Sequence, residues 1–422
     1  MSTVVLGGGV VGVATAWYLA RAGEAVTLVE RQSRAGQETS WGNGCVIHAS
    51  EVEPWSQPGM PSKVVRWMGK EDAPLLVRPR ELPRLVGWGL AFARNSSPEA
   101  FRANARANLD LALLSLRSVQ EIAAETGITY DRATNGVLKI YRDAAGLDAA
   151  DAAMDHLARF GLLRRRVDAA ECLALEPSLA DAGGRIVGGL FFERDEVGDC
   201  SRFTEGLADA AARLGVALRF GEAARRVTLG SGRVTGVETD LGHVAADRVV
   251  VALGSFTKPF LRALGVRVPI RPVKGISITF PRGGWNGAPS RPVIDDSKLF
   301  GLVPVGDRMR ISGSAEVSGF DPAPSRRRAE AIMANAAYTF PSMRAHLDLD
   351  RATVWGGLRP VTPTGTPLIG ETRIPGLWIN AGHGHLGWTL ACGSGRVLAD
   401  LVAGRRPEVA LPPSQGVVRP AA

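Results

Sequence analysis

Cysteine and histidine are scarce in this chain, and neither is grouped. The 422 residues include four dispersed cysteines, Cys45, Cys172, Cys200 and Cys392, with no CxxC pair among them. The six histidines show no metal-ligand spacing either, so no metal site is expected. Unpaired, dispersed cysteines indicate reduced thiols, and the location we expect is cytoplasmic.

Long apolar runs and basic stripes are also missing. No apolar stretch reaches the ~18 residues of a membrane span, and the N-terminus lacks the basic segment and cleavage site of a signal peptide. No basic stripe interleaved with aromatic residues occurs, which argues against a nucleic-acid partner. The formal net charge of +8 instead favours anionic substrates or an anionic membrane surface. At 45% hydrophobic and 22% charged residues, the composition is that of a globular protein large enough for two domains.

The first thirty residues carry a specific pattern. An apolar run at 4–6 is followed by the glycine-rich stretch 7–12, and 14–21 then has a helical pattern. A second apolar run at 25–29 is closed by Glu30. Strand, glycine turn, helix, strand and acid, in this order, are the parts of a dinucleotide-binding βαβ unit. The alternative is a plain glycine-rich turn.

Each residue type in this unit has a physical role. Gly7 permits the tight turn, Gly9 lets the backbone approach a pyrophosphate, and Gly12 allows close packing of helix on strand. The helix N-terminus, which includes Val10 and Val11, would face the phosphates with unpaired N–H groups. Glu30 can accept hydrogen bonds from ribose hydroxyls.

Periodicity along the rest of the chain predicts two interleaved domains. Helical patterns occur at 98–126, 148–160, 201–214 (with Asp199 as N-cap), 326–337 and 389–402. Strand patterns occur at 136–141, 188–192, 217–220, 225–229, 234–239, 248–253, 271–280, 299–305, 309–314 and 377–380, and a Pro- and Gly-rich loop at 54–62. The expected cofactor domain comprises 1–62, 184–257 and 355–405; the substrate domain, with an antiparallel sheet, 63–183 and 258–354; and an unpacked tail, 406–422. The predicted fold class is α/β, a Rossmann-type domain interleaved with an α+β domain.

Two glycine-rich turns could contact the cofactor. The loop 382–389 stands between a strand and a helix, so its N–H groups can point at an anion. Such a helix N-terminus would stabilise the negative charge that a flavin ring gains on reduction. The alternative is a tight helix entry with glycines kept only for packing. The small-residue turn at 252–255 would let the backbone pass near the cofactor.

Arg359 stands in the stretch 356–363, at the end of a Trp- and Gly-rich strand and next to a proline. A planar guanidinium is the natural fork for a carboxylate. The alternative is a surface arginine that lies over apolar residues.

Together these motifs resemble the FAD-dependent D-amino-acid oxidase superfamily and, within it, the bacterial D-amino-acid dehydrogenase small-subunit family. The resemblance spans nearly the whole chain and rests on 10–19, 58–63, 198–200, 272–275, 357–363 and 382–395. It implies FAD as cofactor, oxidation of an amine next to a carboxylate, and Arg359 as the carboxylate anchor. The catalytic candidates are Arg359, His48 and His385. The cofactor-binding candidates are Gly7, Gly9, Val10, Val11, Gly12, Glu30, Arg31, Ser40, Asn43, Gly44, Val227, Gly254, Gly384, His385, Leu386 and Gly387.

The chain departs from the family pattern near the expected pocket. Residues 45–48 replace a Gly-Gln-Ile-Ser-type stretch, and Ile276 stands where a tyrosine is common. His48 is either a polar contact in the pocket or a structural histidine bonded to backbone. Cys45 and Cys392 raise the idea of a covalent flavin, against which we favour small buried cysteines.

The function we expect is oxidative deamination of D-amino acids, cyclic ones such as D-proline or D-hydroxyproline included, by hydride transfer to flavin N5. Electrons would pass to a quinone or another acceptor. Glycine, sarcosine or opine oxidation in the same superfamily, and a flavin-binding subunit inactive without a partner, are the alternatives. Homo- or hetero-oligomers are both compatible with the sequence.

A peripheral membrane contact on the inner face of the membrane is a further hypothesis. Aromatic residues at 67–69 and 85–92 lie among Lys63, Arg66, Arg84 and Arg94, a mixture that suits an interface where quinone is available. Core packing with solvated arginines explains the same residues.

Overall fold

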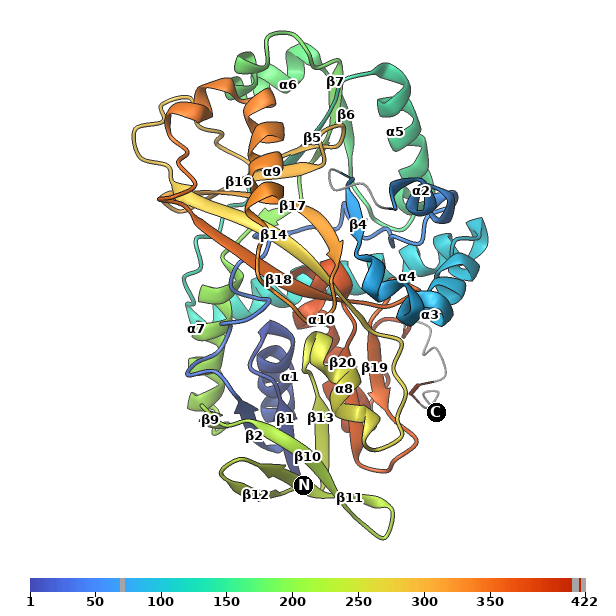
Figure 1. The fold of residues 1–422 in the computed structure, drawn as a ribbon. Helices are drawn as coiled ribbons and strands as arrows, with labels where there is room; N and C mark the ends of the chain where they lie inside the picture. Colours follow the sequence, from blue (N-terminus) through green and yellow to red (C-terminus); the bar gives the residue numbers. More distant parts are fainter. Residues whose placement is uncertain (69–72, 412–416, 419–422) are drawn as a thin grey trace.

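The predicted βαβ unit is present and lies in the middle of a six-stranded sheet (Figure 1). The computed structural model describes residues 1–68, 73–411 and 417–418. All neighbouring strands are parallel except the first two in the order. That order is β19 (Leu368–Glu371), β20 (Leu377–Ala381), β13 (Arg248–Val251), β1 (Ser2–Leu6), β2 (Ala25–Glu30) and β9 (Ala217–Phe220).

Both faces of this sheet are covered, as a mostly parallel sheet requires. Val5 and Val250 pack against the helices, whereas Val4 and Val249 pack against Val237 of a small antiparallel sheet on the other side. This division follows from the alternation of side chains along a strand. The helices are α1 (Val10–Arg21), α7 (Cys200–Arg213) and α10 (Gly387–Val402), and the small sheet is β10 (Ala224–Gly230), β11 (Arg233–Thr239) and β12 (Gly242–Ala245).

A second, nine-stranded sheet lies above the first (Figure 1). Its pairs are antiparallel except β15 with β5 and β17 with β4. The order is β18 (Thr353–Val361), β14 (Arg271–Pro281), β17 (Arg308–Val317), β16 (Phe300–Val305), β15 (Val293–Asp295), β5 (Val137–Tyr141), β7 (Gly188–Phe192) and β6 (Arg165–Asp168), with β4 (Leu75–Val77) beside β17. Its helices are α5 (Ala144–Ala158), α6 (Ala169–Leu175) and α9 (Arg326–Thr339), and α9 packs on the sheet in a shared apolar core.

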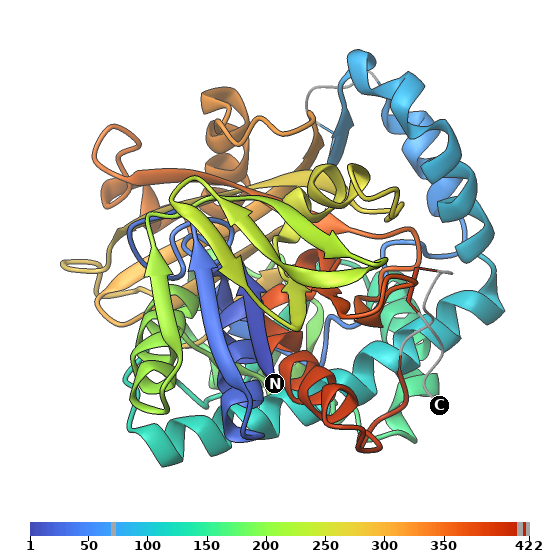
Figure 2. The ribbon, with the colours of Figure 1, turned by 90° about the horizontal axis from the view of Figure 1, so that it is seen from below.

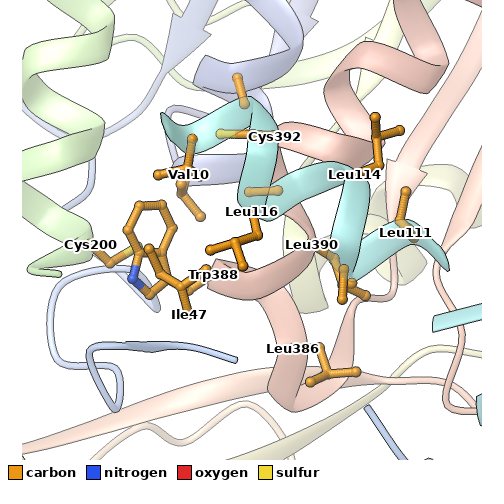
Figure 3. Close-up of a cluster of buried hydrophobic side chains, with 14 of the residues drawn as sticks. Val10, Ile47, Leu111, Leu114, Leu116, Cys200, Leu386, Trp388, Leu390 and Cys392 are labelled. Atoms are coloured by element: carbon orange, nitrogen blue, oxygen red, sulfur yellow. The ribbon is translucent and has the colours of Figure 1, made fainter. Parts of the chain in front are cut away.

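The 29-residue helix α4 (Pro98–Thr126) joins the two halves. Ser97 caps its N-terminus by accepting a hydrogen bond from Ala100 N, and its buried face packs on α10. Leu111 and Leu114 of α4 lie in one apolar cluster with Leu390 and Cys392 of α10 (Figure 3). The remaining short elements are α8 (Thr257–Arg262), β3 (Val46–Ile47) and β8 (Glu196–Val197).

Helices α2 (Met60–Trp67) and α3 (Leu82–Asn95) differ from the others because neither has a buried residue. In the view from below, the blue ribbon of this segment follows the outer edge of the molecule (Figure 2). Among the described residues, no helix is long and apolar enough to cross a membrane.

The fold class is as predicted, and several elements match to the residue, such as 98–126, 188–192 and 217–220. Two expectations were wrong, and helix α3 was not foreseen. The first is the loop 54–62, which ends in the first turn of α2.

The unpacked tail is the second, because its described part is packed. Glu408 forms ion pairs with Arg117 and Arg396, and buried Val418 bridges to Thr372. The strands β7 and β18 come from segments expected in the cofactor domain but pair in the nine-stranded sheet. The domain boundaries themselves stay a prediction.

Candidate active site

A cavity of about 600 Å³ lies between the two sheets. It is walled by the turns that follow the carboxyl ends of β1, β2, β13 and β20, the position where ligands bind in open α/β sheets. Strands β14 and β18 of the nine-stranded sheet close it from above. The fold therefore brings the N-terminal turn, the C-terminal glycine loop and Arg359 together in one cavity.

Most predicted site residues line this cavity. The residues on its wall are Gly7, Gly9, Val10, Val11, Glu30, Arg31, Ser40, Asn43, Gly44, His48, Gly254, Arg359, Gly384, His385 and Gly387. Gly12, Val227 and Leu386 do not line it.

These three residues lie in packed regions for clear reasons. A Cβ on Gly12 would overlap the Gly7 carbonyl, so Gly12 serves the close helix–strand packing predicted for it. Val227 faces the core under β10, and Ala224 and Arg225 of that strand line the cavity instead. Leu386 is fully buried in the apolar cluster beneath the loop (Figure 3).

The turn from β1 into α1 places the N-terminus of α1 on the cavity wall. Gly7 has φ +107°, and a Cβ there would lie 2.6 Å from the Ala252 carbonyl oxygen, so only glycine fits. No side chain of the N-cap residue Gly9 caps α1, and Val10 N donates to Ser40 Oγ at 3.1 Å. The remaining first-turn N–H groups can bind an anion.

Glu30 ends β2 beside this turn. Its carboxylate accepts hydrogen bonds from Gly8 N at 2.5 Å and Gln32 N at 2.7 Å. Burial raises the pKa of Glu30, and the two backbone donors oppose that rise. The carboxylate is thereby held where a ribose hydroxyl can donate to it.

The C-terminal glycine loop supplies a second helix N-terminus on the wall of the same cavity. A short 3₁₀ turn, Gly384–Leu386, leads directly into the 16-residue helix α10, and no side chain caps that helix. Gly384 and Gly387 line the cavity. The N–H groups and dipole of α10 therefore favour negative charge at this point.

The guanidinium of Arg359 is surrounded by protein and faces the same cavity. It donates to the Ser314 carbonyl at 3.0 Å and lies 5.8 Å from the Trp55 ring centroid. Among the described residues no carboxylate lies within 4 Å of it, and burial, the only influence on its pKa, lowers that pKa to about 10. Arg359 therefore borders the cavity and does not lie over the outer surface. The free donors of an uncompensated guanidinium fit a carboxylate.

Two histidines lie on the same wall as Arg359. The ring of His385 stacks on Trp55 (centroids 5.2 Å apart), its Nε2 lies 3.1 Å from the Glu51 carbonyl oxygen, and burial lowers its pKa to about 4. His48 Nδ1 is buried and has no hydrogen-bond partner within the described ranges, and burial lowers the pKa of this ring too. Both imidazoles are therefore neutral near pH 7.

Sequence reasoning missed an ion pair at this end of the cavity. Lys139 Nζ lies 2.9 Å from the Glu51 carboxylate and 2.9 Å from that of Asp296. Burial is the largest single influence and raises the pKa of Glu51, but the groups around the carboxylate, Lys139 first among them, together outweigh it, so the pKa is lowered. Ser312, in a strand without a motif, was also missed, and so was Trp355, which stands just before the stretch that contains Arg359. No local signal joins residues 51 and 139.

Neither Cys45 nor Cys392 lines the cavity. Cys45 is fully buried, with its Sγ 2.9 Å from Arg310 Nη1, and burial raises its pKa to about 11. Cys392 is in the apolar cluster of Figure 3, where burial also raises its pKa. Both are therefore the small buried cysteines that we favoured. The part of the chain that the structure describes contains no cluster suited to a metal ion.

Comparisons with known proteins agree with this architecture. Residues 2–401 match the family model DAO, FAD dependent oxidoreductase. A D-amino acid dehydrogenase of Paramagnetospirillum magneticum is 44% identical over 406 residues, covering 96% of each chain. One from Methylobacterium nodulans is 43% identical over 411 residues and 97% of each chain. Glycine oxidase from Geobacillus kaustophilus (TM-score 0.77, 21% identity, 100% and 99% of the chains) and L-proline dehydrogenase from P. horikoshii (TM-score 0.77, 18% identity, 99% of each) share the fold.

The fold and site define a dinucleotide-dependent oxidoreductase. The chain belongs to the DAO family of FAD-dependent oxidoreductases, which confirms the resemblance seen in the sequence. The residues present fit FAD: the helix N-terminus of α1 for the pyrophosphate, Glu30 for the ribose, and the N-terminus of α10 on the wall of the same cavity.

Proposed function

We propose that this enzyme oxidatively deaminates D-amino acids to imino acids, which water hydrolyses to 2-oxo acids and ammonia. The observation that carries the proposal is the Arg359 guanidinium, which faces the cofactor cavity and has no carboxylate partner among the described residues. The names of the relatives, D-amino acid dehydrogenase, support the substrate class.

Arg359 would bind the substrate carboxylate and fix which face of Cα is presented. Bound FAD supplies the hydride acceptor. The Ser314 carbonyl takes one guanidinium N–H, and the remaining donors hold the carboxylate as a planar fork. Fixing the carboxylate in one orientation accounts for much of the rate, because the entropy cost of orienting the reacting atoms is met when the substrate binds.

The neutral histidines would suit the amine. The substrate amine must be uncharged at hydride transfer. A neutral imidazole nitrogen can accept a hydrogen bond from an N–H of that amine. His48, whose Nδ1 lacks a partner among the described residues, is the candidate acceptor. The apolar wall residues Ile276 and Ile294 suit an aliphatic or cyclic side chain, D-proline and D-hydroxyproline included.

A quinone is the electron acceptor that we propose, met at an anionic membrane surface through α2 and α3. Val65, Val86 and Leu90 on these helices are 64%, 63% and 60% exposed. Residues 60–95 carry seven Lys or Arg against three Asp or Glu, so net +4 of the chain's +8 lies in this segment. Exposed apolar residues among cations are typical of interfacial helices.

The reaction is tested by anaerobic titration of the holoenzyme with D- and L-amino acids, sarcosine and both hydroxyproline series. Bleaching of flavin absorbance by D-amino acids but not by their L-enantiomers is expected. Reduction by glycine or sarcosine alone, with rapid reoxidation by air, would favour the amine-oxidase alternative. A flavin that no amine reduces would favour a subunit that needs a partner.

The membrane contact has its own test, flotation with vesicles. Binding to phosphatidylglycerol vesicles but not to neutral ones is expected, because the segment is cationic. The double variant Val86→Ser/Leu90→Ser should lose it, while Leu229→Ser/Leu241→Ser, which changes two other exposed leucines, should not. Equal flotation of both variants would contradict this surface.

A further inference from the structure

A second cavity, of about 630 Å³, lies beside the candidate active site, between α2, α3, α9 and strands β4 and β17. Its lining is almost wholly apolar and includes Trp67, Trp88, Phe92, Val273 and Val317. A chamber of this size and chemistry suits an apolar ring system with a hydrocarbon chain. None of the chemistry assigned to the first cavity uses it.

The two cavities share a wall. Trp55 lines the second cavity and stacks on His385, which lines the first. Ser314 lines the second cavity, and its carbonyl accepts the hydrogen bond from Arg359, which lines the first. A molecule bound in the second cavity is therefore one side-chain layer from the substrate site.

The second cavity opens toward the surface proposed to meet the membrane. Val65, Met68 and Leu82 line it and are exposed, as is Leu299 on the other side, so one opening of the cavity lies between α2 and α3. Glu81, which precedes α3, is buried and forms an ion pair with Arg84. This opening thus presents apolar side chains among cations, which complements an anionic bilayer.

We propose that this second cavity binds a lipid-soluble quinone that enters from the bilayer between α2 and α3. The proposal rests on the proposed function, since the quinone is the acceptor of that reaction. Arg271 lines the cavity, and its Nε is buried without a hydrogen-bond partner among the described residues. A quinone carbonyl oxygen is the acceptor that we assign to this guanidinium.

The redox step balances without another reactant. Quinone reduction to the quinol takes two electrons and two protons, and both come from the reduced cofactor. The cofactor returns to its oxidised form, so each D-amino acid oxidised yields one quinol.

Two glycines of α3 provide a matched test. Gly89 lines the second cavity and Gly87 does not, and no heavy atom lies within 4 Å of a Cβ built at either position. Gly89→Phe would place a ring in the chamber, whereas Gly87→Phe adds the same ring outside it. The probe is decylubiquinone, and its binding to the holoenzyme is measured by quenching of tryptophan fluorescence, since Trp55, Trp67 and Trp88 line the chamber.

Gly89→Phe should raise the Kd for decylubiquinone about tenfold or more and slow anaerobic reoxidation of the reduced flavin correspondingly. Gly87→Phe should match the parent protein. Flavin reduction by the D-amino acid should be unchanged in both. Equal decylubiquinone binding by the two variants, or no binding by the parent protein, would overturn the proposal.

Failure of the proposed function is distinguishable from failure of this inference. If no amino acid bleaches the flavin, dithionite-reduced holoenzyme still reports quinone binding and reoxidation. If Gly89→Phe instead impairs reduction by bulky D-amino acids and leaves decylubiquinone binding unchanged, the cavity holds the substrate side chain and the quinone site is rejected.

Discussion

Gly275 leaves the space that the guanidinium of Arg359 occupies. The two residues lie on the adjacent strands β14 and β18, and a Cβ on Gly275 would overlap the guanidinium carbon and both terminal nitrogens. The Ser314 carbonyl, 3.0 Å from Nη1, holds the group from β17. The backbone of two neighbouring strands therefore sets the position of the candidate substrate anchor.

Replacing Arg359 by lysine should raise KM for the best D-amino acid about 10- to 100-fold, because an ammonium cannot reproduce the two-pronged hydrogen bonding of a guanidinium. Steady-state kinetics measure this effect. FAD content should stay at the parental level, since Arg359 is not among the predicted cofactor contacts. An unchanged KM would remove Arg359 as the anchor.

Gly275→Ala should reproduce much of that defect without touching the arginine. The new methyl group would displace the guanidinium, and we expect KM to rise about tenfold, with little change in Tm if the side chain can shift. Gly87→Ala, in open space on α3, serves as the control. Wild-type kinetics for Gly275→Ala would show that the gap between β14 and β18 does not set the position of the anchor.

Gly7→Ala should abolish retention of FAD. Its positive φ costs about 1–2 kcal/mol for alanine, and the Cβ would collide with the Ala252 carbonyl oxygen at 2.6 Å. Gly23 has a similar φ of +87° but nothing within 4 Å, so Gly23→Ala carries the strain without the collision. The ratio of flavin absorbance to protein after gel filtration separates the two. Equal FAD loss in both variants would mean that strain alone is responsible.

Acidification should destabilise the protein through His385. Burial lowers its pKa from 6.5 to about 4, so between these values the unfolded chain binds more protons than the folded one. Stability therefore falls as the pH drops from about 6.5 toward 4, by about 3 kcal/mol for this group. Thermal unfolding at pH 7 and pH 5 should show a smaller loss for His385→Gln than for the parent protein. An identical loss in both would exclude His385 as a source.

The sequence predicted the local parts of the fold well because their signals are local. The glycine turn needs a positive φ at Gly7, and the 98–126 helix repeats its apolar residues on one face. Helix α3 was missed because Pro83, Gly87 and Gly89 favour a loop in a single-sequence reading. The pairing of β7 and β18 into the upper sheet depends on partners far along the chain, which periodicity does not encode.

The candidate site, too, was predicted from the sequence only where its signals are local. By itself the sequence determined the cofactor unit, the glycine loop before α10 and Arg359, because each is a short run with its own backbone geometry. Only the tertiary structure decided that these runs meet in one cavity, that Lys139 neutralises Glu51, and that Trp55 separates that cavity from a second one. Such contacts join residues up to hundreds of positions apart. They are fixed by the packing of two sheets on one another, and no local pattern records that packing.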